Sequence, residues 1–234
     1  CGISRSITLN QIENLARERG IPWICHFTRI SNFRSILGTG HIISRNELDQ
    51  NDDIYFQAND PRRADGHKNK ICCSITRPNP WLLQKWKDAP LNEDEFIIIC
   101  IDTSVLNDSC LFSSTNAATR SGQYVKGGTD GFNAMFAETV PSIHLDSGEK
   151  YRRSDLRHDL TTDEQAEVLV PNAIDIEYLV SVIVENQSTE RRVSDDLLLY
   201  RKLRRVKIRR QPHYFNWKNS DRISSTYSFN YRNF

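Results

Sequence analysis

One carboxylate stands where the chain enters a predicted buried strand. Glu167 begins the apolar run at residues 167–170, which Pro171 ends, and Gln165 precedes it by two positions. Alternate side chains of a strand share a face, so Gln165 and Glu167 should point the same way. A carboxylate that enters a core costs free energy unless it is paired or has a chemical role. The Gln-x-Glu spacing suits work at a ribose, where Gln165 holds the substrate while Glu167 faces the anomeric carbon.

A second polar pair belongs to the strand predicted at residues 23–28. His26 and Thr28 should lie on one face of this strand, with Cys25 and Phe27 on the other. An imidazole and a hydroxyl beside the start of a helix can bind ribose hydroxyls or phosphate. The alternative is a structural histidine beside a threonine in the β-ladder, and the pattern alone favours that alternative.

Two adjacent arginines, Arg62 and Arg63, lie in a long polar segment at residues 46–70. A loop of this length in a compact domain is usually functional or disordered. Guanidinium groups bind pyrophosphate in bidentate fashion, although solvated surface positions are more common. The glycines at 127–131 permit close approach of a ligand to the backbone. The chain has neither a GxGxxG nor a Walker motif, which gives no support to a Rossmann or P-loop fold.

Short strands and few helices have to position these residues. Further apolar runs predict strands at residues 71–76, 96–102 and 178–184. Helical periodicity and end signals predict helices at residues 8–19, from Ser31 to the glycines at 38 and 40, and at 81–86, 132–136 and 195–206. This mixture favours the α+β class.

Charge is distributed unevenly along the chain. The 234 residues suit one domain, or one domain with a tail, and carry a net charge of +1. Residues 191–234, however, contain twelve Lys or Arg against three Asp, together with eight aromatic residues. Basic side chains follow phosphates and flat rings accept stacked bases, so this segment predicts nucleic-acid binding. The alternative is a solvated helix followed by a packed tail.

The cysteines and the apolar runs indicate the compartment. None of the six cysteines forms a Cys-x-x-Cys pair, so we expect small buried thiols in a reducing environment, not disulfides or zinc ligands. No apolar run is long enough to span a bilayer, and no secretory signal is visible. We therefore expect a cytoplasmic protein without a membrane partner.

Several segments, taken in order, resemble the DarT family of DNA ADP-ribosyltransferase toxins. The resemblance is carried by residues 26–37, 71–75, 78–81, 114–118, 131–136 and 165–171, and it covers roughly residues 23–184. It implies the ADP-ribosyltransferase split mixed β-sheet, with few helices and with NAD in the cleft between the halves. We assign residues 1–190 to the catalytic domain and residues 191–234 to a basic, aromatic extension packed on the same domain.

The resemblance also implies roles for individual residues. Glu167 would be the catalytic glutamate, and Arg63 would be the catalytic-loop arginine, with Arg62 left open as its alternative. Four residues would bind the NAD co-substrate: His26, Thr28, Asn32 and Gln165. No metal is implied.

The acceptor should be a base of single-stranded DNA, because a base edge inside a duplex cannot reach such a cleft. Three residues are expected to contact this substrate: Tyr55, Trp81 and Phe132. Thymine-modifying members often carry a histidine where Phe132 stands, and residues 131–136 look more like the guanine-modifying branch. The family usually acts as the toxin of a toxin–antitoxin or phage-defence system. Its expected partner is an antitoxin that removes ADP-ribose, a macrodomain-type or related hydrolase.

Two alternatives remain open. The Gln-x-Glu spacing also occurs in protein-modifying relatives, so the acceptor could be RNA or protein. A non-enzymatic nucleic-acid-binding module would need only the basic tail, but it leaves the Gln165–Glu167 pair unexplained.

Overall fold

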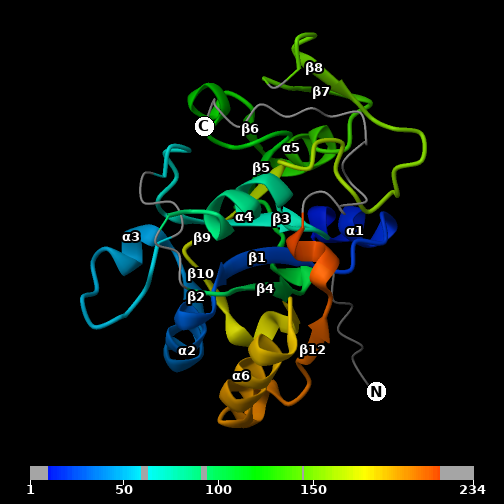
Figure 1. Ribbon diagram of the computed structural model, residues 1–234. Coiled ribbons are helices and arrows are strands. Elements are labelled where there is room, and N and C mark those ends of the chain that lie inside the picture. The colour runs from blue at the N-terminus through cyan, green and yellow to red at the C-terminus, as the bar shows by residue number, and fades with distance from the viewer. Residues whose placement is uncertain (1–9, 59–62, 91–93, 144, 217–234) are drawn as a thin grey trace, which may run out of the picture.

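The computed structural model describes residues 10–58, 63–90, 94–143 and 145–216 (Figure 1). The strands of this part of the chain are β1 (Ile24–Arg29), β2 (His41–Ile43), β3 (Lys70–Ile75), β4 (Phe96–Ile101), β5 (Leu111–Ser113), β6 (Val125–Gly127), β7 (Thr139–Pro141), β8 (Glu149–Tyr151), β9 (Glu167–Pro171), β10 (Ala173–Asp175), β11 (Leu179–Val184) and β12 (Lys207–Arg210). The α-helices are α1 (Gln11–Glu18), α2 (Ile30–Thr39), α3 (Arg45–Leu48), α4 (Pro80–Lys87), α5 (Gly128–Ala134) and α6 (Gln187–Leu198), and a 3-10 turn, η5, spans Pro212–Phe215.

Eight of these strands form one mixed sheet in the order β12-β11-β4-β1-β3-β9-β5-β6. β11 and β12 run parallel, whereas every other neighbouring pair in the sheet is antiparallel. Two smaller antiparallel pairs, β2 with β10 and β7 with β8, lie beside the main sheet. A mixed sheet with six α-helices in the described chain confirms the predicted α+β class.

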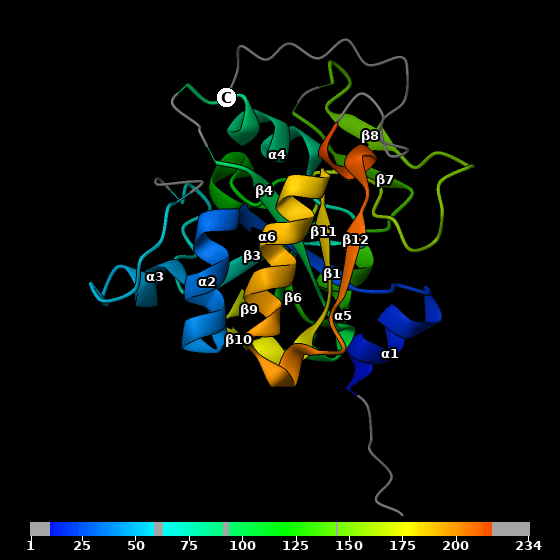
Figure 2. The same cartoon turned by 60° about the horizontal axis from the view of Figure 1, so that its bottom comes forward.

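β4 is buried on both of its faces. All six of its residues are apolar, and none is more than 3% exposed. Ile97, Ile99 and Ile101 face the larger core cluster, to which α2 and α6 contribute, while Ile98 and Cys100 face a smaller cluster beneath α4 and η5. Helices therefore cover both sides of the sheet, and Figure 2 shows α2 and α6 side by side over one of them.

The sheet divides between β1 and β3. Their ladder holds only at Ile24 and Cys25, after which β1 follows β4 along its whole length while β3 pairs with β9. Strands that diverge leave backbone N–H and C=O groups without ladder partners, and buried groups of this kind need another partner. The ring of His26 supplies one such partner, because its Nδ1 lies 2.9 Å from the carbonyl oxygen of Cys72.

The β7–β8 hairpin is attached to the turn that precedes β9. Lys150 of β8 donates a hydrogen bond to Glu164 and lies 3.6 Å from Asp163, and the three side chains are 12%, 4% and 3% exposed. Trp81 of α4 donates from Nε1 to Glu164 at 2.8 Å, and the hydroxyl of Thr115 donates to Asp163 at 2.7 Å. The turn that leads into Glu167 is thus fixed from three sides.

Two helices lie elsewhere than the sequence pattern predicts. The helix expected at residues 195–206 is α6, which begins at Gln187 and ends at Leu198. The side chain of Asn186 accepts from the backbone N–H of Thr189, a capping signal that the leucine pattern concealed. Leu198, the last residue of α6, and Leu199 after it are each 78% exposed, because the buried face of α6 carries Val193 and Leu197 instead. None of the described helices has the length and apolar character to cross a membrane.

The short helix expected at residues 132–136 is α5, which begins at Gly128. The glycines at 127–131 were predicted to let a ligand approach the backbone, but Gly131 instead lets α5 pack closely against β6. A Cβ atom at Gly131 would lie 2.5 Å from the carbonyl oxygen of Lys126, closer than real Cβ contacts. The absence of a side chain therefore serves the approach of α5 to β6.

The described part of the basic C-terminal segment, residues 191–216, joins the main sheet through β12. β12 pairs with β11 from Lys207 to Arg210, and the boundary predicted at residue 190 falls within α6. The aromatic residues from Trp217 onward lie outside the described residues. Deletion of residues 191–234 would cut α6 and remove β12, so nucleic-acid binding by this segment has to be tested with point substitutions.

Substitution Lys150→Ala should destabilise the protein, because it leaves the buried Asp163 and Glu164 without their cation. Breaking a buried pair by removal of one partner typically costs about 3 kcal/mol of unfolding free energy. Urea unfolding followed by circular dichroism measures this loss. Lys202→Ala is the matched control, because the Lys202–Glu177 pair is exposed on the surface and should contribute little. Equal unfolding midpoints for the two variants would contradict this role of Lys150.

Candidate active site

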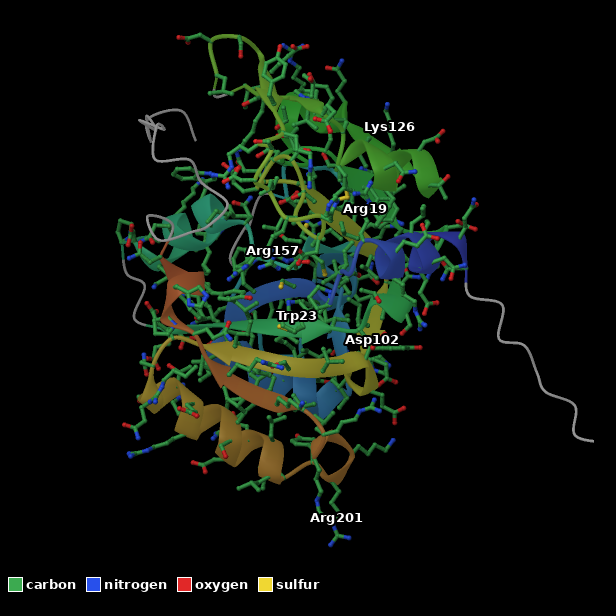
Figure 3. All side chains as sticks on the ribbon, turned by 90° about the vertical axis from the view of Figure 1, so that its right-hand side faces the viewer. Arg19, Trp23, Asp102, Lys126, Arg157 and Arg201 are labelled. Atoms are coloured by element: carbon green, nitrogen blue, oxygen red, sulfur yellow. The ribbon has the colours of Figure 1, made fainter. Side chains whose placement is uncertain are left out.

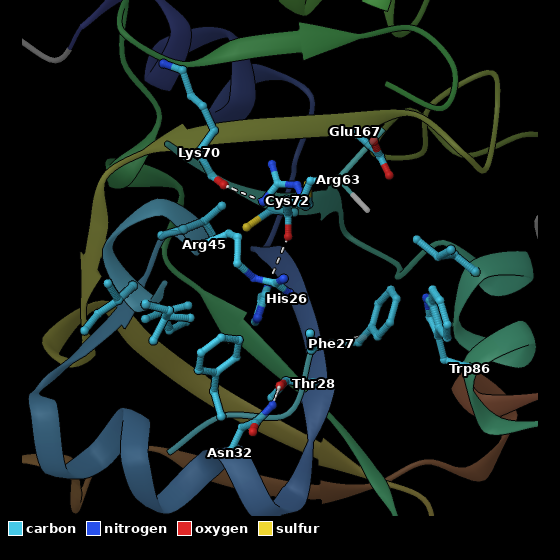
Figure 4. Close-up of a pocket in the computed structure, with 18 of the residues that line it drawn as sticks. His26, Phe27, Thr28, Asn32, Arg45, Arg63, Lys70, Cys72, Trp86 and Glu167 are labelled. Carbon is cyan, nitrogen blue, oxygen red and sulfur yellow. Dashed lines mark hydrogen bonds between the residues drawn. The ribbon is translucent and has the colours of Figure 1, made fainter. Parts of the chain in front are cut away.

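A cavity of about 750 Å³ lies where β1 and β3 diverge (Figure 4). Its wall is formed by β1, α2, the segment from α3 to Ala58, β3, α4 and the start of β9. This volume is in the range of about 300–1,000 Å³ that is usual for small-molecule sites. The split of the sheet therefore produces a ligand-sized space lined by residues distant in the sequence.

His26 faces this cavity with a defined tautomer. A carbonyl oxygen can only accept, so Nδ1 of His26 carries the hydrogen that it donates to Cys72, and Nε2 is left as an acceptor. Burial lowers the pKa of His26, the hydrogen bond to Cys72 opposes that shift, and the charge of Arg63 adds to it. The ring is consequently neutral at pH 7 and suited to accept a hydrogen bond from a hydroxyl group.

Thr28 and Asn32 form one hydrogen-bonded unit with the loop opposite them. The Nδ2 atom of Asn32 donates to the hydroxyl of Thr28 and to the carbonyl oxygen of Gln57, each at 3.0 Å. Its Oδ1 accepts from the backbone N–H of Gln57 at 2.7 Å. Asn32 therefore holds the segment from α3 to Ala58 against β1, and both Thr28 and Asn32 line the cavity.

Arg63 is fixed inside the loop that carries it. Its guanidinium donates two hydrogen bonds to Asp65, at 2.9 and 2.8 Å, and also donates to the carbonyl oxygens of Lys70 and His67, at 2.9 and 2.6 Å. Its backbone has a positive φ of 44°. Burial opposes the charged form, but the bonds to Asp65 and the nearby acidic groups, including Glu167, raise the pKa of Arg63 above its ordinary value. Arg62 lies outside the described residues, so its position does not bear on the choice between the two arginines.

Glu167 is the first residue of β9 and lines the cavity while only 6% exposed. Its backbone pairs with Ser113 of β5, and its Oε2 accepts from the backbone N–H of Ala117 at 2.9 Å. Gln165 lies in the turn before β9 and not in the strand, yet its side chain also lines the cavity. The structure therefore brings Gln165, Glu167 and His26 to one cavity. The prediction that Gln165 belongs to the strand and shares its face with Glu167 is wrong, because the strand begins only at Glu167.

The three predicted substrate residues have different surroundings. Tyr55 lines the cavity and is 57% exposed, whereas Trp81 lines it while only 3% exposed. Phe132 does not reach the cavity: it is fully buried, with its ring 5.5 Å from Phe112 and 5.3 Å from Phe136. The prediction that Phe132 contacts substrate is wrong for this geometry, because α5 turns that ring into the core between its own helix and β5.

Other residues of the site gave no sequence signal. Arg45 of α3 lines the cavity with its side chain 13% exposed and its guanidinium 5.1 Å from the ring centroid of Phe56. Asp65 and the N–H of Ala117 hold Arg63 and Glu167 in place. A single arginine or a backbone N–H has no pattern of its own, so only the folded chain identifies these contacts.

Two adjacent cysteines of β3 are held as thiols, which are weak nucleophiles. Burial raises the pKa of Cys72, which lines the cavity, and of Cys73 well above the ordinary value, so both are thiols at pH 7. All five cysteines of the described chain are free, four of them are buried, and Cys1 lies outside it. No group of His, Cys, Asp and Glu residues in the described ranges has the arrangement of a metal site.

Comparison with solved structures finds the same fold. Thermosipho africanus DarTG in complex with ADP-ribose has a TM-score of 0.57 and 19% identity over 83% of this chain and 51% of that chain. Thermus sp. 2.9 DarT in complex with carba-NAD⁺ has a TM-score of 0.57 and 15% identity over 82% of this chain and 96% of that chain. The same protein in complex with ADP-ribosylated ssDNA has a TM-score of 0.57 and 14% identity, over 82% and 95% of the two chains.

The chain thus spans about half the length of the Thermosipho chain and nearly all of the Thermus chain. A search of curated proteins found no significant match. The sequence model of the family described as "ssDNA thymidine ADP-ribosyltransferase, DarT" matches residues 25–216. That range includes every residue that lines the cavity, from Cys25 at its first position to Glu167. The chain belongs to the DarT family of single-stranded DNA ADP-ribosyltransferases.

Proposed function

We propose that the protein transfers ADP-ribose from NAD onto a base of single-stranded DNA. The observation that carries this proposal is the shared cavity of Glu167 and His26, a buried carboxylate and a neutral imidazole on the two halves of a split sheet. A carboxylate stabilises a sugar cation, and a neutral imidazole accepts a hydrogen bond from a sugar hydroxyl. Membership of the DarT family and the NAD complexes of its Thermus member support the choice of co-substrate.

The cavity wall offers suitable partners for each part of NAD. The Nε2 of His26, with Thr28 and Asn32 beside it, would accept from ribose hydroxyls and hold the carboxamide region. The guanidinium groups of Arg45 and Arg63 lie in the wall and can attract the pyrophosphate. Glu167 begins β9 and Gln165 lies in the turn before it, where the nicotinamide ribose would be placed.

In this arrangement, the bond between the anomeric carbon and the nicotinamide nitrogen breaks first. Its electron pair leaves with nicotinamide as a neutral molecule, and the sugar becomes an oxocarbenium-like cation. Glu167, with one oxygen fixed by the N–H of Ala117, stabilises that cation and accepts from the ribose 2′-hydroxyl. A nitrogen of the base then donates its electron pair to the anomeric carbon, and its proton passes to Glu167.

We propose that guanine is modified in preference to thymine. This preference is supported by the sequence of residues 131–136, where thymine-modifying members often carry a histidine and this chain has Phe132. Phe132 itself lies in the core and does not line the cavity, so the preference rests on the likeness of residues 131–136 to the guanine-modifying branch. The family description names thymidine, and an experiment therefore has to offer both bases.

We further propose that the protein acts as a toxin whose mark a partner hydrolase removes. A bulky ADP-ribosyl group on a template base blocks base pairing, which would harm the host cell unless the group is removed. The antitoxin would be a macrodomain-type or related ADP-ribosyl hydrolase.

The experiment that tests the proposal is incubation with NAD and short single-stranded oligonucleotides, each containing one guanine or one thymine as the only variable base. Mass spectrometry should show one added ADP-ribosyl group, and nicotinamide should appear in equal amount. Parallel incubations with RNA and with protein pools test the alternative acceptors. A non-enzymatic binding module would release no nicotinamide in any of them.

Substitution Glu167→Gln should abolish most transfer while the protein stays folded, because the amide cannot stabilise the sugar cation or take up the proton. Loss of an electrostatic stabiliser of this kind costs about 2.7–4 kcal/mol of barrier, a fall in kcat of roughly 100- to 1,000-fold. Nicotinamide release measures the rate, and circular dichroism confirms folding. Full activity of folded Glu167→Gln would reject the assignment.

The neutral state of His26 leads to a pH dependence of NAD binding. Because burial lowers the pKa of His26, its protonation in the folded protein begins only below its ordinary value of about 6.5. The KM for NAD should therefore stay constant from pH 8 to about pH 6.5 and rise at lower pH, when Nε2 stops being an acceptor. His26→Gln retains a donor for the Cys72 carbonyl and should remove this rise. A KM that already increases between pH 8 and pH 7 would contradict a neutral, accepting His26.

A further inference from the structure

Two stretches of chain meet at Glu167: the turn before β9 and the segment that follows β5. β5 ends at Ser113, whose backbone pairs with Glu167. Further along the chain, the backbone N–H of Ala117 donates to Oε2 of Glu167 at 2.9 Å. Because Ala117 lies beyond the end of the ladder, the path of residues 114–117 decides where that N–H group stands.

Thr115 attaches this path to the turn. Its hydroxyl donates to Oδ2 of Asp163 at 2.7 Å, and both residues are only 2% exposed. The side chain of Asn116, in contrast, bonds within its own segment, where its Oδ1 accepts from the N–H of Ala118 at 3.0 Å. Thr115 therefore links residues 114–117 to the turn through a buried side-chain hydrogen bond.

Asp163 transmits this attachment to the residues that follow it. Its second carboxyl oxygen, Oδ1, accepts from the backbone N–H of Gln165 at 3.0 Å. One oxygen thus bonds the segment after β5, while the other bonds the turn that carries Gln165 into the cavity wall. The segment after β5 consequently holds the turn at two points, once at Asp163 and once at Glu167.

Two attachments restrict a movement that one attachment would allow. A single hydrogen bond between two loops lets one loop shift relative to the other, whereas bonds at separate points oppose that shift. The N–H of Ala117 and the carboxyl group of Glu167 are thereby kept in one relative position. Catalytic groups need such precision, because a displacement of about 1 Å can lower a rate by roughly 100-fold.

We infer that Thr115 is a positioning residue for Glu167 and acts through Asp163. The inference rests on the proposed transfer reaction, in which Glu167 stabilises the sugar cation. Thr115 does not line the cavity, so its hydroxyl is not placed to touch NAD or DNA there. Loss of this hydroxyl should consequently lower the rate of the chemical step and leave NAD binding intact.

Substitutions at one position test this role. Thr115→Val removes the hydroxyl and keeps the branched shape of the side chain, and Thr115→Ser restores the hydroxyl. Thr119→Val is the matched control, because Thr119 follows in the same loop, is 6% exposed and donates no hydrogen bond to the turn in the described chain. Arg201→Ala is a second control, because the exposed side chain of Arg201 points into solvent (Figure 3).

For each variant, nicotinamide release is measured against NAD concentration with a saturating single-stranded oligonucleotide. Thr115→Val should lower kcat by about tenfold or more and leave the KM for NAD within about twofold of the parent value, as expected when an interaction of the transition state alone is lost. Thr115→Ser should recover most of kcat, and both controls should match the parent protein. A merely structural role of the hydroxyl would not separate kcat from KM in this way.

A combined variant shows whether Thr115 acts through Glu167. Addition of Thr115→Val to Glu167→Gln should lower the residual rate by less than about twofold, because the carboxylate that Thr115 positions is already absent. A further fall of about tenfold in this background would mean that Thr115 affects the rate by another route, and would overturn the inference.

The outcomes separate this inference from the proposed function. A parent protein that releases no nicotinamide and modifies no oligonucleotide contradicts the proposed function, and the inference with it. A parent protein that transfers normally, alongside a folded Thr115→Val variant with unchanged kcat, overturns only the positioning role. A rise in the KM for NAD without a fall in kcat has the same meaning.

Circular dichroism and thermal unfolding establish that each variant is folded. If Thr115→Val does not fold, Thr115→Ala carries the test, because it places no methyl group against the carboxyl group of Asp163. Failure of both variants to fold would assign the hydrogen bond to the fold alone and would also overturn the inference.

Discussion

The hydrogen bond between the ring of His26 and the carbonyl of Cys72 closes the point where β1 and β3 separate. An opening inside a sheet exposes backbone groups that a continuous ladder would have paired, and buried groups of this kind must find other partners. Side chains of the site supply hydrogen-bond partners for backbone groups along the opening. Asn32 bonds the backbone of Gln57, and Arg63 bonds two carbonyl oxygens of its own loop. Side chains that line the cavity therefore also satisfy backbone groups at its edges and fix the positions of those edges.

The buried carboxyl groups in and after the turn before β9 depend on a neighbouring cation, Lys150. Asp163, Glu164 and Glu167 are all buried within five positions of the sequence, so their charges would repel one another in a medium of low dielectric. Burial opposes ionisation of Glu164, but Lys150 holds the pKa of that carboxyl below its ordinary value. Burial and the neighbouring charge of Glu164 raise the pKa of Asp163. Lys150 therefore allows the turn to remain charged and folded, and that turn sets the position of Glu167.

Much of this arrangement could be predicted from the sequence, and the reason is physical. Strands such as β4 and β9 are short apolar runs, and β1 places His26 and Thr28 on one face by simple alternation. The start of β9 marks Glu167, because a carboxylate at that place is unusual. The family resemblance joined these segments into one cleft, and the matching family model confirms the family. The branch within it stays a prediction.

The remaining features depend on contacts that a single sequence does not encode locally. Phe132 resembled a cavity residue by its position in the chain, but the packing of α5 against β5 directs its ring into the core. Lys150 lies in a polar stretch without periodicity, so its attachment to Glu164 becomes visible only in three dimensions.

The central claim is that the split of the sheet holds NAD with its nicotinamide ribose at the start of β9. A crystal structure of Glu167→Gln with intact NAD tests it most directly, because this variant should bind the dinucleotide without consuming it. We expect the side chain at position 167 to lie within hydrogen-bonding distance of the 2′-hydroxyl of that ribose, with Nε2 of His26 in contact with the same dinucleotide. A dinucleotide bound outside the split, or with its nicotinamide ribose turned away from position 167, would contradict the account.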